Sequence, residues 1–200
     1  AFEPAEAKLI AELEEFAGYE HLLEDALRQA AAAAELPLDD AAVQALVGSA
    51  TGWPLYEDAR RALPGLAEHF RLAVATQLDE AAARELLGPL GVSFDVVVGA
   101  DRVGCFKPEP DHLLALVHEL ELDEDQLLHV AADADLDLHV AAGLGIPTAY
   151  VDRFGMPLPE EVEPVLRVGS LDDLAEPLLR PRSGGGRRGG RGRAEGRESG

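Results

Sequence analysis

The sequence predicts an α/β fold: a three-layer, Rossmann-like core with a parallel sheet, preceded by an all-helical region. Two patterns support this prediction. The first fifty residues show only helical periodicity, whereas short apolar strands alternate with amphipathic helices from about residue 55 onward. This alternation is typical of βαβ units, whose parallel sheet is covered by helices on both faces. A third observation is that polar residues directly follow several of the apolar runs, as expected at the carboxyl edge of such a sheet.

The N-terminal region is predicted to contain three helices. Residues 5–16 place apolar side chains on one helical stripe, and residues 20–34 repeat that pattern. Pro37 and the pair Asp39–Asp40 mark a turn and the N-cap of a third helix. Residues 48–54, GSATGWP, break the helical pattern and separate this region from the rest of the chain.

The second region is predicted to alternate between helices and strands. Residues 59–70 suit a helix, although Pro64 and Gly65 should shorten it or split it in two. The elements expected after it are strand 72–76, helix 78–91, strand 94–100, helix 108–120, strand 127–132, helix 136–145 and a final strand at 146–151. Residues 180–200 are rich in arginine and glycine, and we expect them to be disordered because they can bury little apolar area.

Composition narrows the range of partners. The net charge is −21, although residues 180–200 hold seven arginines and two glutamates, so residues 1–179 are strongly acidic. Such a body repels nucleic acids and anionic membranes, and the tail lacks the interleaved aromatic residues typical of RNA contacts. No apolar run approaches the length of a membrane span. The single cysteine, Cys105, excludes an internal disulfide and favours a reducing, cytoplasmic location with a buried, unreactive thiol.

Three strand ends bring chemistry-bearing residues to one edge of the predicted sheet. Thr76 follows the first strand, Lys107 lies in the loop beyond the second, and Asp133, Asp135 and Asp137 follow the third. A hydroxyl, an ammonium group and carboxylates gathered in this way could hold an anion or a metal ion. Each also has a structural interpretation: Thr76, Asp133 or Asp135 could cap a helix, and Lys107 could be an ordinary surface residue.

This combination resembles the haloacid dehalogenase superfamily of hydrolases over roughly residues 53–153, and most closely its 2-haloacid dehalogenase (type II) branch. Thr76 in VATQ is similar to the second motif of that family, Lys107 in FKPEP to the third, and Asp133 and Asp137 in DADLD to the acidic fourth. The resemblance implies a helical cap at 1–52, the α/β core at 53–179 and an appended tail at 180–200.

The sequence also departs from that family. The first motif of the family is an apolar strand ending in DxD or DxYGT, whose first aspartate is the nucleophile, and no such strand is visible before residue 70. We therefore expect a segment carrying this central strand to be missing, which would leave a gap between its neighbours. Gln77 replaces the usual Asn, and Leu113 stands where these dehalogenases typically carry Tyr.

Three functions remain open at this point. In a dehalogenase, which needs no cofactor, Thr76 and Gln77 would hold the substrate, Lys107 would keep the nucleophile ionised and Asp137 would orient Lys107. Arg28 is the candidate in the cap for gripping the substrate carboxylate. In a phosphatase, Asp133 and Asp137 would bind Mg²⁺. The third alternative is a catalytically inactive relative with a binding role. The expected partner is a small anionic substrate, and a homodimer is left open.

Overall fold

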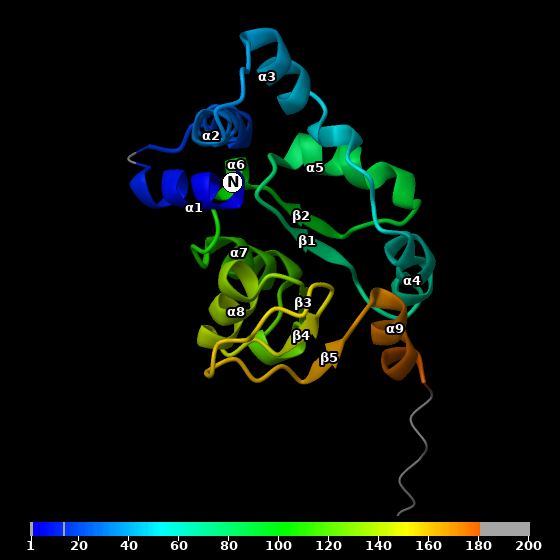
Figure 1. The fold of residues 1–200 in the computed structure, drawn as a ribbon. Helices are drawn as coiled ribbons and strands as arrows, with labels where there is room; N and C mark the ends of the chain where they lie inside the picture. Colours follow the sequence, from blue (N-terminus) through cyan, green and yellow to red (C-terminus); the bar gives the residue numbers. More distant parts are fainter. Residues whose placement is uncertain (1, 14, 181–200) are drawn as a thin grey trace, which may run out of the picture.

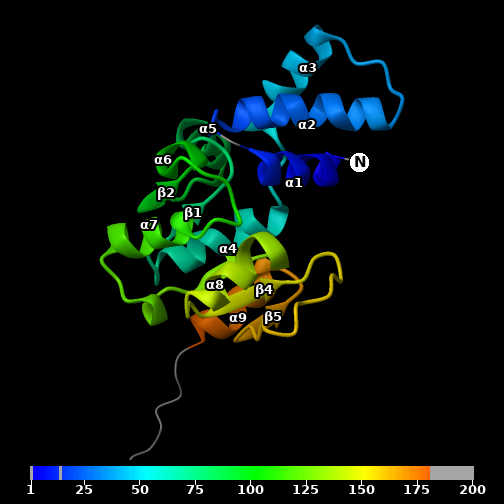
Figure 2. The ribbon, with the colours of Figure 1, turned by 90° about the vertical axis from the view of Figure 1, so that its left-hand side faces the viewer.

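The structure is a computed structural model that describes residues 2–13 and 15–180 (Figures 1 and 2). The predicted disordered tail lies, apart from Arg180, outside the described residues. Within the described part of the chain, no helix has the length and apolar character needed to cross a membrane.

The predicted N-terminal helices are present. They are α1 (Phe2–Glu12), α2 (Tyr19–Ala33) and α3 (Asp40–Val47), followed by a short 3₁₀ turn, η1 (Ala50–Gly52). Asp39 is the N-cap of α3, as predicted, because its side chain accepts a hydrogen bond from the Ala42 amide at 2.8 Å. Helices α1 and α2 lie side by side at one end of the molecule, and α3 lies beyond them (Figure 2).

The described residues contain five short strands in a sheet of two parts, and all of them are parallel to their neighbours. They are β1 (Ala73–Ala75), β2 (Val96–Val98), β3 (His129–Ala131), β4 (Thr148–Val151) and β5 (Leu166–Val168). The first four confirm predicted strands, each shorter than expected. The prediction that 146–151 is the final strand is wrong, because β5 follows it. Its three residues, Leu-Arg-Val, are too few to be recognised as a strand from the sequence.

Helices connect these strands in the predicted alternation. They are α4 (Glu57–Ala67), α5 (Glu80–Leu87), η2 (Gly88–Leu90), α6 (Ala100–Val103), α7 (Asp111–Leu120), η3 (Glu124–Gln126), the π-helical turn η4 (Ala134–Leu138), α8 (His139–Gly143) and α9 (Leu171–Leu179). Helix α5 ends at Gly88 as predicted, and the single helix expected at 136–145 is replaced by η4 and α8.

The prediction that Pro64 and Gly65 interrupt the helix before β1 is wrong, because α4 continues through both. Tertiary packing explains the difference. Ala62 and Leu66 of α4 are buried against α9, which lies beside it. A Cβ atom on Gly65 would lie 3.4 Å from the Leu179 side chain, an ordinary van der Waals contact, so α9 packs directly over this position. Burial against α9 outweighs the loss of one helical hydrogen bond at Pro64.

The sheet is divided into two parts rather than continuous. One part contains β2 and β1, and the other contains β3, β4 and β5 in that order. The amide of Thr76 donates to Val98 O, so the peptide groups of Ala73 and Ala75 point away from β2. The amide of His129 donates to Pro147 O, so the peptide group of Val130 points away from β4. Strands β1 and β3 therefore each have one edge without a neighbouring strand among the described residues.

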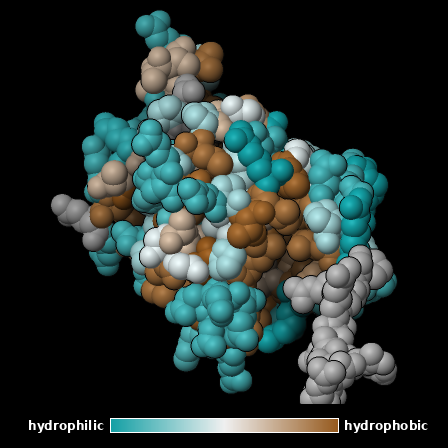
Figure 3. Space-filling view, turned by 90° about the horizontal axis from the view of Figure 1, so that it is seen from below, coloured by the Kyte–Doolittle hydropathy of each residue, from teal (hydrophilic) through white to brown (hydrophobic). Residues whose placement is uncertain are grey.

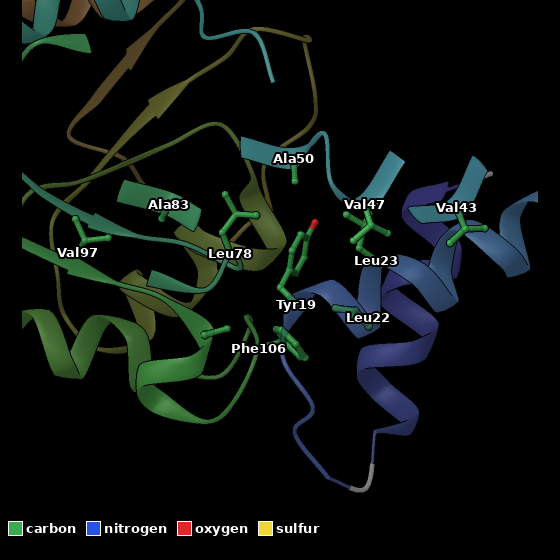
Figure 4. Packing of buried hydrophobic residues seen from close by; sticks show 11 residues of the cluster. Tyr19, Leu22, Leu23, Val43, Val47, Ala50, Leu78, Ala83, Val97 and Phe106 are labelled. Atoms are coloured by element: carbon green, nitrogen blue, oxygen red, sulfur yellow. The ribbon is translucent and has the colours of Figure 1, made fainter. Parts of the chain in front are cut away.

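The N-terminal helices share a hydrophobic cluster with the first part of the sheet (Figure 4). Buried side chains from α2 and α3 meet residues of β2, α5 and the adjoining loops; the cluster is Tyr19, Leu22, Leu23, Val43, Val47, Ala50, Leu78, Ala83, Val97, Ala100 and Phe106. Phe106 directly precedes Lys107 and contacts the rings of Phe16 and Tyr19. The N-terminal helices are thus in contact with the loop that carries Lys107, and the helical cap at residues 1–52 stays a prediction.

Large hydrophobic side chains are exposed near the second part of the sheet. Seen from below, the molecule has a contiguous apolar area bordered by hydrophilic residues (Figure 3). The exposed large hydrophobic side chains between β4 and β5 include Phe154, Met156 and Val165.

Candidate active site

Lys107 lies where the two parts of the sheet meet. Its ammonium group donates a hydrogen bond of 3.0 Å to the carbonyl oxygen of Ala75, the last residue of β1. It also forms an ion pair of 2.6 Å with Asp137, which lies in the π-helical turn after β3. Only 12% of the Lys107 side chain and 14% of the Asp137 side chain are exposed. The interpretation of Lys107 as an ordinary surface residue is therefore wrong: Lys107 is a largely buried cation that joins two strand ends.

Gln77 holds the backbone of Lys107 in place. The Lys107 amide donates to Gln77 Oε1 at 2.8 Å, and Gln77 Nε2 donates to the Lys107 carbonyl at 3.4 Å. Both ends of this amide side chain are therefore engaged with Lys107, 30 residues away. The sequence assigned Gln77 to the substrate, but in the structure it positions the lysine.

Asp137 is held by two cationic or polar partners. Its Oδ1 atom lies 2.6 Å from Lys107 Nζ and 3.1 Å from His129 Nε2. Burial alone would raise the pKa of Asp137, but the hydrogen bond from His129 and the charge of Lys107 outweigh it, so the pKa lies below its ordinary value. Asp137 is therefore an ionised carboxylate at neutral pH. Its expected orienting contact with Lys107 is present.

His129 is a member of this group that the sequence did not identify. It is the first residue of β3 and lies inside an apolar run, where a histidine is ordinarily a core residue. In the sequence it precedes Asp137 by eight residues. Sequence spacing did not reveal the contact because the π-helical turn η4 directs Asp137 back toward the strand.

Thr76 lies directly after β1, at the same edge. Its Oγ1 atom accepts a hydrogen bond of 3.2 Å from the Leu78 amide. The hydroxyl hydrogen can still be donated to an anion, since a hydroxyl group both donates and accepts. Thr76 is not the N-cap of the next helix, because that position belongs to Asp79. The structural interpretation of Thr76 as a helix cap is therefore wrong.

The remaining predicted residues are not gathered at this edge. Asp133 is exposed, and its side chain caps η4 by accepting from the Leu136 amide at 2.7 Å, which confirms its structural interpretation. Arg28 lies on α2 and forms ion pairs with Glu24 and Asp40 at 2.8 and 2.9 Å. The substrate contact assigned to Arg28 therefore has no support in this arrangement.

The described residues do not by themselves form a magnesium site. No group of three His, Cys, Asp or Glu side chains in residues 2–13 and 15–180 is arranged to hold a metal ion. Asp137 is already paired with Lys107, and Asp133 is engaged with the backbone of η4. A divalent cation needs several oxygen ligands, which this pair of carboxylates does not offer in its present contacts.

Cys105 is not part of the chemistry. Burial, together with Asp111 and Glu109, raises the pKa of its thiol to about 11, so the thiol is protonated at neutral pH. The side chain is half-buried rather than fully buried as expected.

Comparisons with known proteins agree with this geometry. The family model of the haloacid dehalogenase-like hydrolases matches residues 3–145. The phosphoglycolate phosphatase of Rhodospirillum rubrum is 35% identical over 130 residues, which are 62% of this chain and 52% of that protein. The chain thus spans about half the length of this curated relative.

Solved structures share the fold at low sequence identity. A dehalogenase superposes with a TM-score of 0.82 at 20% identity, over 90% of this chain and 82% of the other. The L-2-haloacid dehalogenase of Xanthobacter autotrophicus, solved with chloropropionic acid covalently bound, gives a TM-score of 0.78 at 20% identity, over 89% and 84% of the two chains. Because the family model matches well over half of the residues, the chain belongs to the haloacid dehalogenase-like hydrolases.

Proposed function

We propose that this protein hydrolyses a small 2-haloacid through a covalent aspartyl intermediate. The observation that supports the proposal best is the buried Lys107 ammonium group, held between Ala75 O and Asp137 at the carboxyl edge of the sheet. A fixed positive charge in a largely buried setting stabilises a nearby carboxylate and the charge that develops on it during reaction. Thr76 supplies a hydroxyl donor at the same edge for the carboxylate of the substrate.

The nucleophile in this proposal lies on a strand between β1 and β3. The peptide groups of Ala73, Ala75 and Val130 point into this interval, and both strands are only half-buried. A parallel strand placed there would form ladders with both neighbours and would end beside Lys107. Such a strand is not among residues 2–13 and 15–180. An aspartate at its carboxyl end would reach the lysine, as the first motif of the family implies.

The reaction has two steps. The aspartate oxygen attacks carbon 2 of the substrate, the carbon–halogen bond breaks, and halide leaves with the bonding electrons. Water then attacks the carbonyl carbon of the resulting ester, which releases the 2-hydroxy acid and a proton and regenerates the aspartate. Lys107 keeps the nucleophile ionised, and Asp137 orients Lys107. Neither step requires a metal ion or a redox cofactor.

A phosphatase acting on a small phosphate ester is the second candidate. The specific support for it is the 35% identity with a phosphoglycolate phosphatase. In that case the aspartate would attack phosphorus, and Mg²⁺ would be needed. The described carboxylates do not fit that ion without further ligands from the missing strand, so we rank this candidate second.

The test uses the protein expressed from its full reading frame alongside the 200-residue chain. We expect the full product to release chloride from 2-chloropropionate without added metal, and the 200-residue chain to release none. Phosphate release from phosphoglycolate that requires Mg²⁺, with no chloride release, would replace the first proposal by the second. If the full product catalyses neither reaction, a non-catalytic binding role is the better description. The cytoplasmic location and the homodimer stay predictions.

A further inference from the structure

His129 contacts the candidate active site, although the proposed reaction assigns it no role. Its Nε2 atom lies 3.1 Å from Asp137 Oδ1, the same oxygen atom that accepts from Lys107 Nζ at 2.6 Å. Only 10% of the His129 side chain is exposed. An ionised carboxylate can only accept hydrogen bonds, so Nε2 carries the hydrogen of this contact. Two donors from different parts of the chain therefore converge on one carboxylate oxygen.

The backbone of His129 is fixed by the sheet. His129 is the first residue of β3, where it is in register with Thr148 of β4, and its amide donates to Pro147 O at 2.8 Å. Asp137 lies in the π-helical turn η4, and its carboxylate accepts from no group in the described part of the chain other than Lys107 and His129. The sheet therefore locates this carboxylate through the ring of His129.

The position of Asp137 in turn affects how the Lys107 ammonium group is oriented. An ammonium group has three N–H donors. One donates to Ala75 O at 3.0 Å and one to Asp137 Oδ1 at 2.6 Å, whereas the third has no partner among the described residues. Because the two acceptors fix the ammonium group, the direction of the third N–H depends on where Asp137 Oδ1 lies. A small misplacement of a charged group at a reaction centre is costly to the rate.

We propose that His129 is a positioning residue for Lys107, which it holds through Asp137. The ring keeps Asp137 Oδ1 at the point where the ammonium group binds this oxygen and Ala75 O at once, so that the third N–H remains for the reacting carboxylate at this edge of the sheet. His129 itself touches neither the nucleophile nor the substrate. This inference rests on the proposed role of Lys107 but not on the identity of the substrate or of its leaving group.

The first test measures how fast acetic anhydride acylates Lys107 in the protein expressed from its full reading frame. Mass spectrometry gives the rate relative to Lys8, whose side chain is 62% exposed. We expect His129→Leu to raise this ratio about tenfold, the value of one hydrogen bond to a charged group. His129→Gln retains an N–H donor and should stay close to the unmodified protein. His139→Leu is the matched control, because His139 faces Glu161 at 3.4 Å in an exposed pair, and it should leave the ratio unchanged.

Two further measurements separate positioning from a purely structural role. In an Asp137→Asn background, His129→Leu should not change the acylation ratio further, because His129 acts through that carboxylate. In ¹⁵N spectra of the histidine rings, Nε2 of His129 should carry a hydrogen. An unchanged ratio in His129→Leu, an equal rise in His129→Gln, additive effects with Asp137→Asn, or a ring with its hydrogen on Nδ1 alone would each overturn the inference.

Kinetics of the full product connect this role to the proposed reaction. With 2-chloropropionate, we expect His129→Leu to lower kcat about tenfold and to change KM by less than about twofold, because Lys107 acts on the charge of the reacting carboxylate. An unchanged kcat, or a change in KM alone, would contradict the inference. If the acylation results are as expected but the full product releases no chloride, the dehalogenase proposal fails and the positioning of Lys107 by His129 stands.

Discussion

The unpaired strand edges of the sheet differ from one another. The outer edge of β2 is the one that faces away from β1, and the inner edges of β1 and β3 are those without a neighbouring strand among the described residues. All three residues of β2 are buried, and the Val97 carbonyl on its outer edge accepts a hydrogen bond of 3.1 Å from Arg102. This charged side chain closes the edge against further pairing. The inner edges of β1 and β3 are half-buried, and of their peptide groups only Ala75 O has a side-chain partner in the described chain, Lys107. The difference indicates that the outer edge ends the sheet, whereas the inner edges are suited to receive a strand.

Side chains and helices, rather than a strand ladder, hold the two parts of the sheet together. At the carboxyl edge, Lys107 connects β1 with Asp137 after β3. At the same edge, next to β4 and β5, α4 packs against α9, and Asp58 of α4 accepts hydrogen bonds from Arg153 after β4 and from the Leu171 amide at the start of α9. The importance of each connection can be tested separately.

The largest effect is expected at Lys107. Lys107→Met leaves the buried Asp137 carboxylate without its cation, so we expect a loss of about 3 kcal/mol in the free energy of unfolding. Activity of the full product should fall by about 10²–10³-fold, as for loss of one charge-stabilising donor. Urea denaturation and chloride release measure the two effects. Lys8→Met is the matched control, because Lys8 forms only an exposed pair with Glu12 at 4.0 Å; equal losses in both variants would contradict the assignment.

The same substitution should change the pH dependence of stability. The pKa of Asp137 in the folded protein lies below its ordinary value of 3.8, so its contribution is present at neutral pH and is lost as the pH falls below that value. In Lys107→Met one cause of the lowered pKa is gone, so the free energy of unfolding should decrease less as the pH falls. Urea denaturation between pH 3 and 7 would show it, and an unchanged acid loss would indicate that Lys107 does not stabilise the carboxylate.

A smaller effect is expected at the second connection, the one through Asp58. Asp58→Ala removes the acceptor of the Arg153 guanidinium at 2.7 Å and of the Leu171 amide at 2.8 Å, both in a buried setting. We expect a loss of about 2 kcal/mol, because Arg153 retains its contact with the Tyr56 ring. Asp172→Ala, which breaks the exposed pair with Arg61, should cost less than about 0.5 kcal/mol. Similar losses in the two variants would show that the packing of α4 against α9 does not depend on the pair of Asp58 and Arg153.

The smallest effect is expected in the hydrogen exchange of neighbouring amides in β1 and β3. In the 200-residue chain, the amides of Ala75 and Val130 should exchange their hydrogens about tenfold faster than those of Thr76 and His129, which are bonded to neighbouring strands. In the product of the full reading frame, the two pairs should become similarly slow, because a strand then fills the interval. Equal protection in the 200-residue chain would mean that the inner edges are already paired.

Much of this architecture was predictable from local patterns. Short apolar runs after the helical region identified β1 to β4, since they recur at the spacing of βαβ units, and Asp39 was recognisable as an N-cap. Thr76, Lys107 and Asp137 were identified because the carboxyl ends of parallel strands share one edge. That a strand carrying the first motif of the family belongs between β1 and β3 stays a prediction. β5 was not recognised, because the alternation of Leu, Arg and Val covers only three residues, fewer than a strand pattern needs to stand out.

The sequence by itself determined that Thr76, Lys107 and Asp137 reach the carboxyl edge, because the position of a residue after its strand is a local property. The tertiary structure alone decided what these side chains contact there. Gln77 binds the backbone of Lys107, His129 joins Asp137, Asp133 caps a π-helical turn, and α4 continues through Pro64 because α9 packs against it. Each of these contacts joins groups whose distance depends on a π-turn, a loop path or a neighbouring helix, and no sequence period reports such distances.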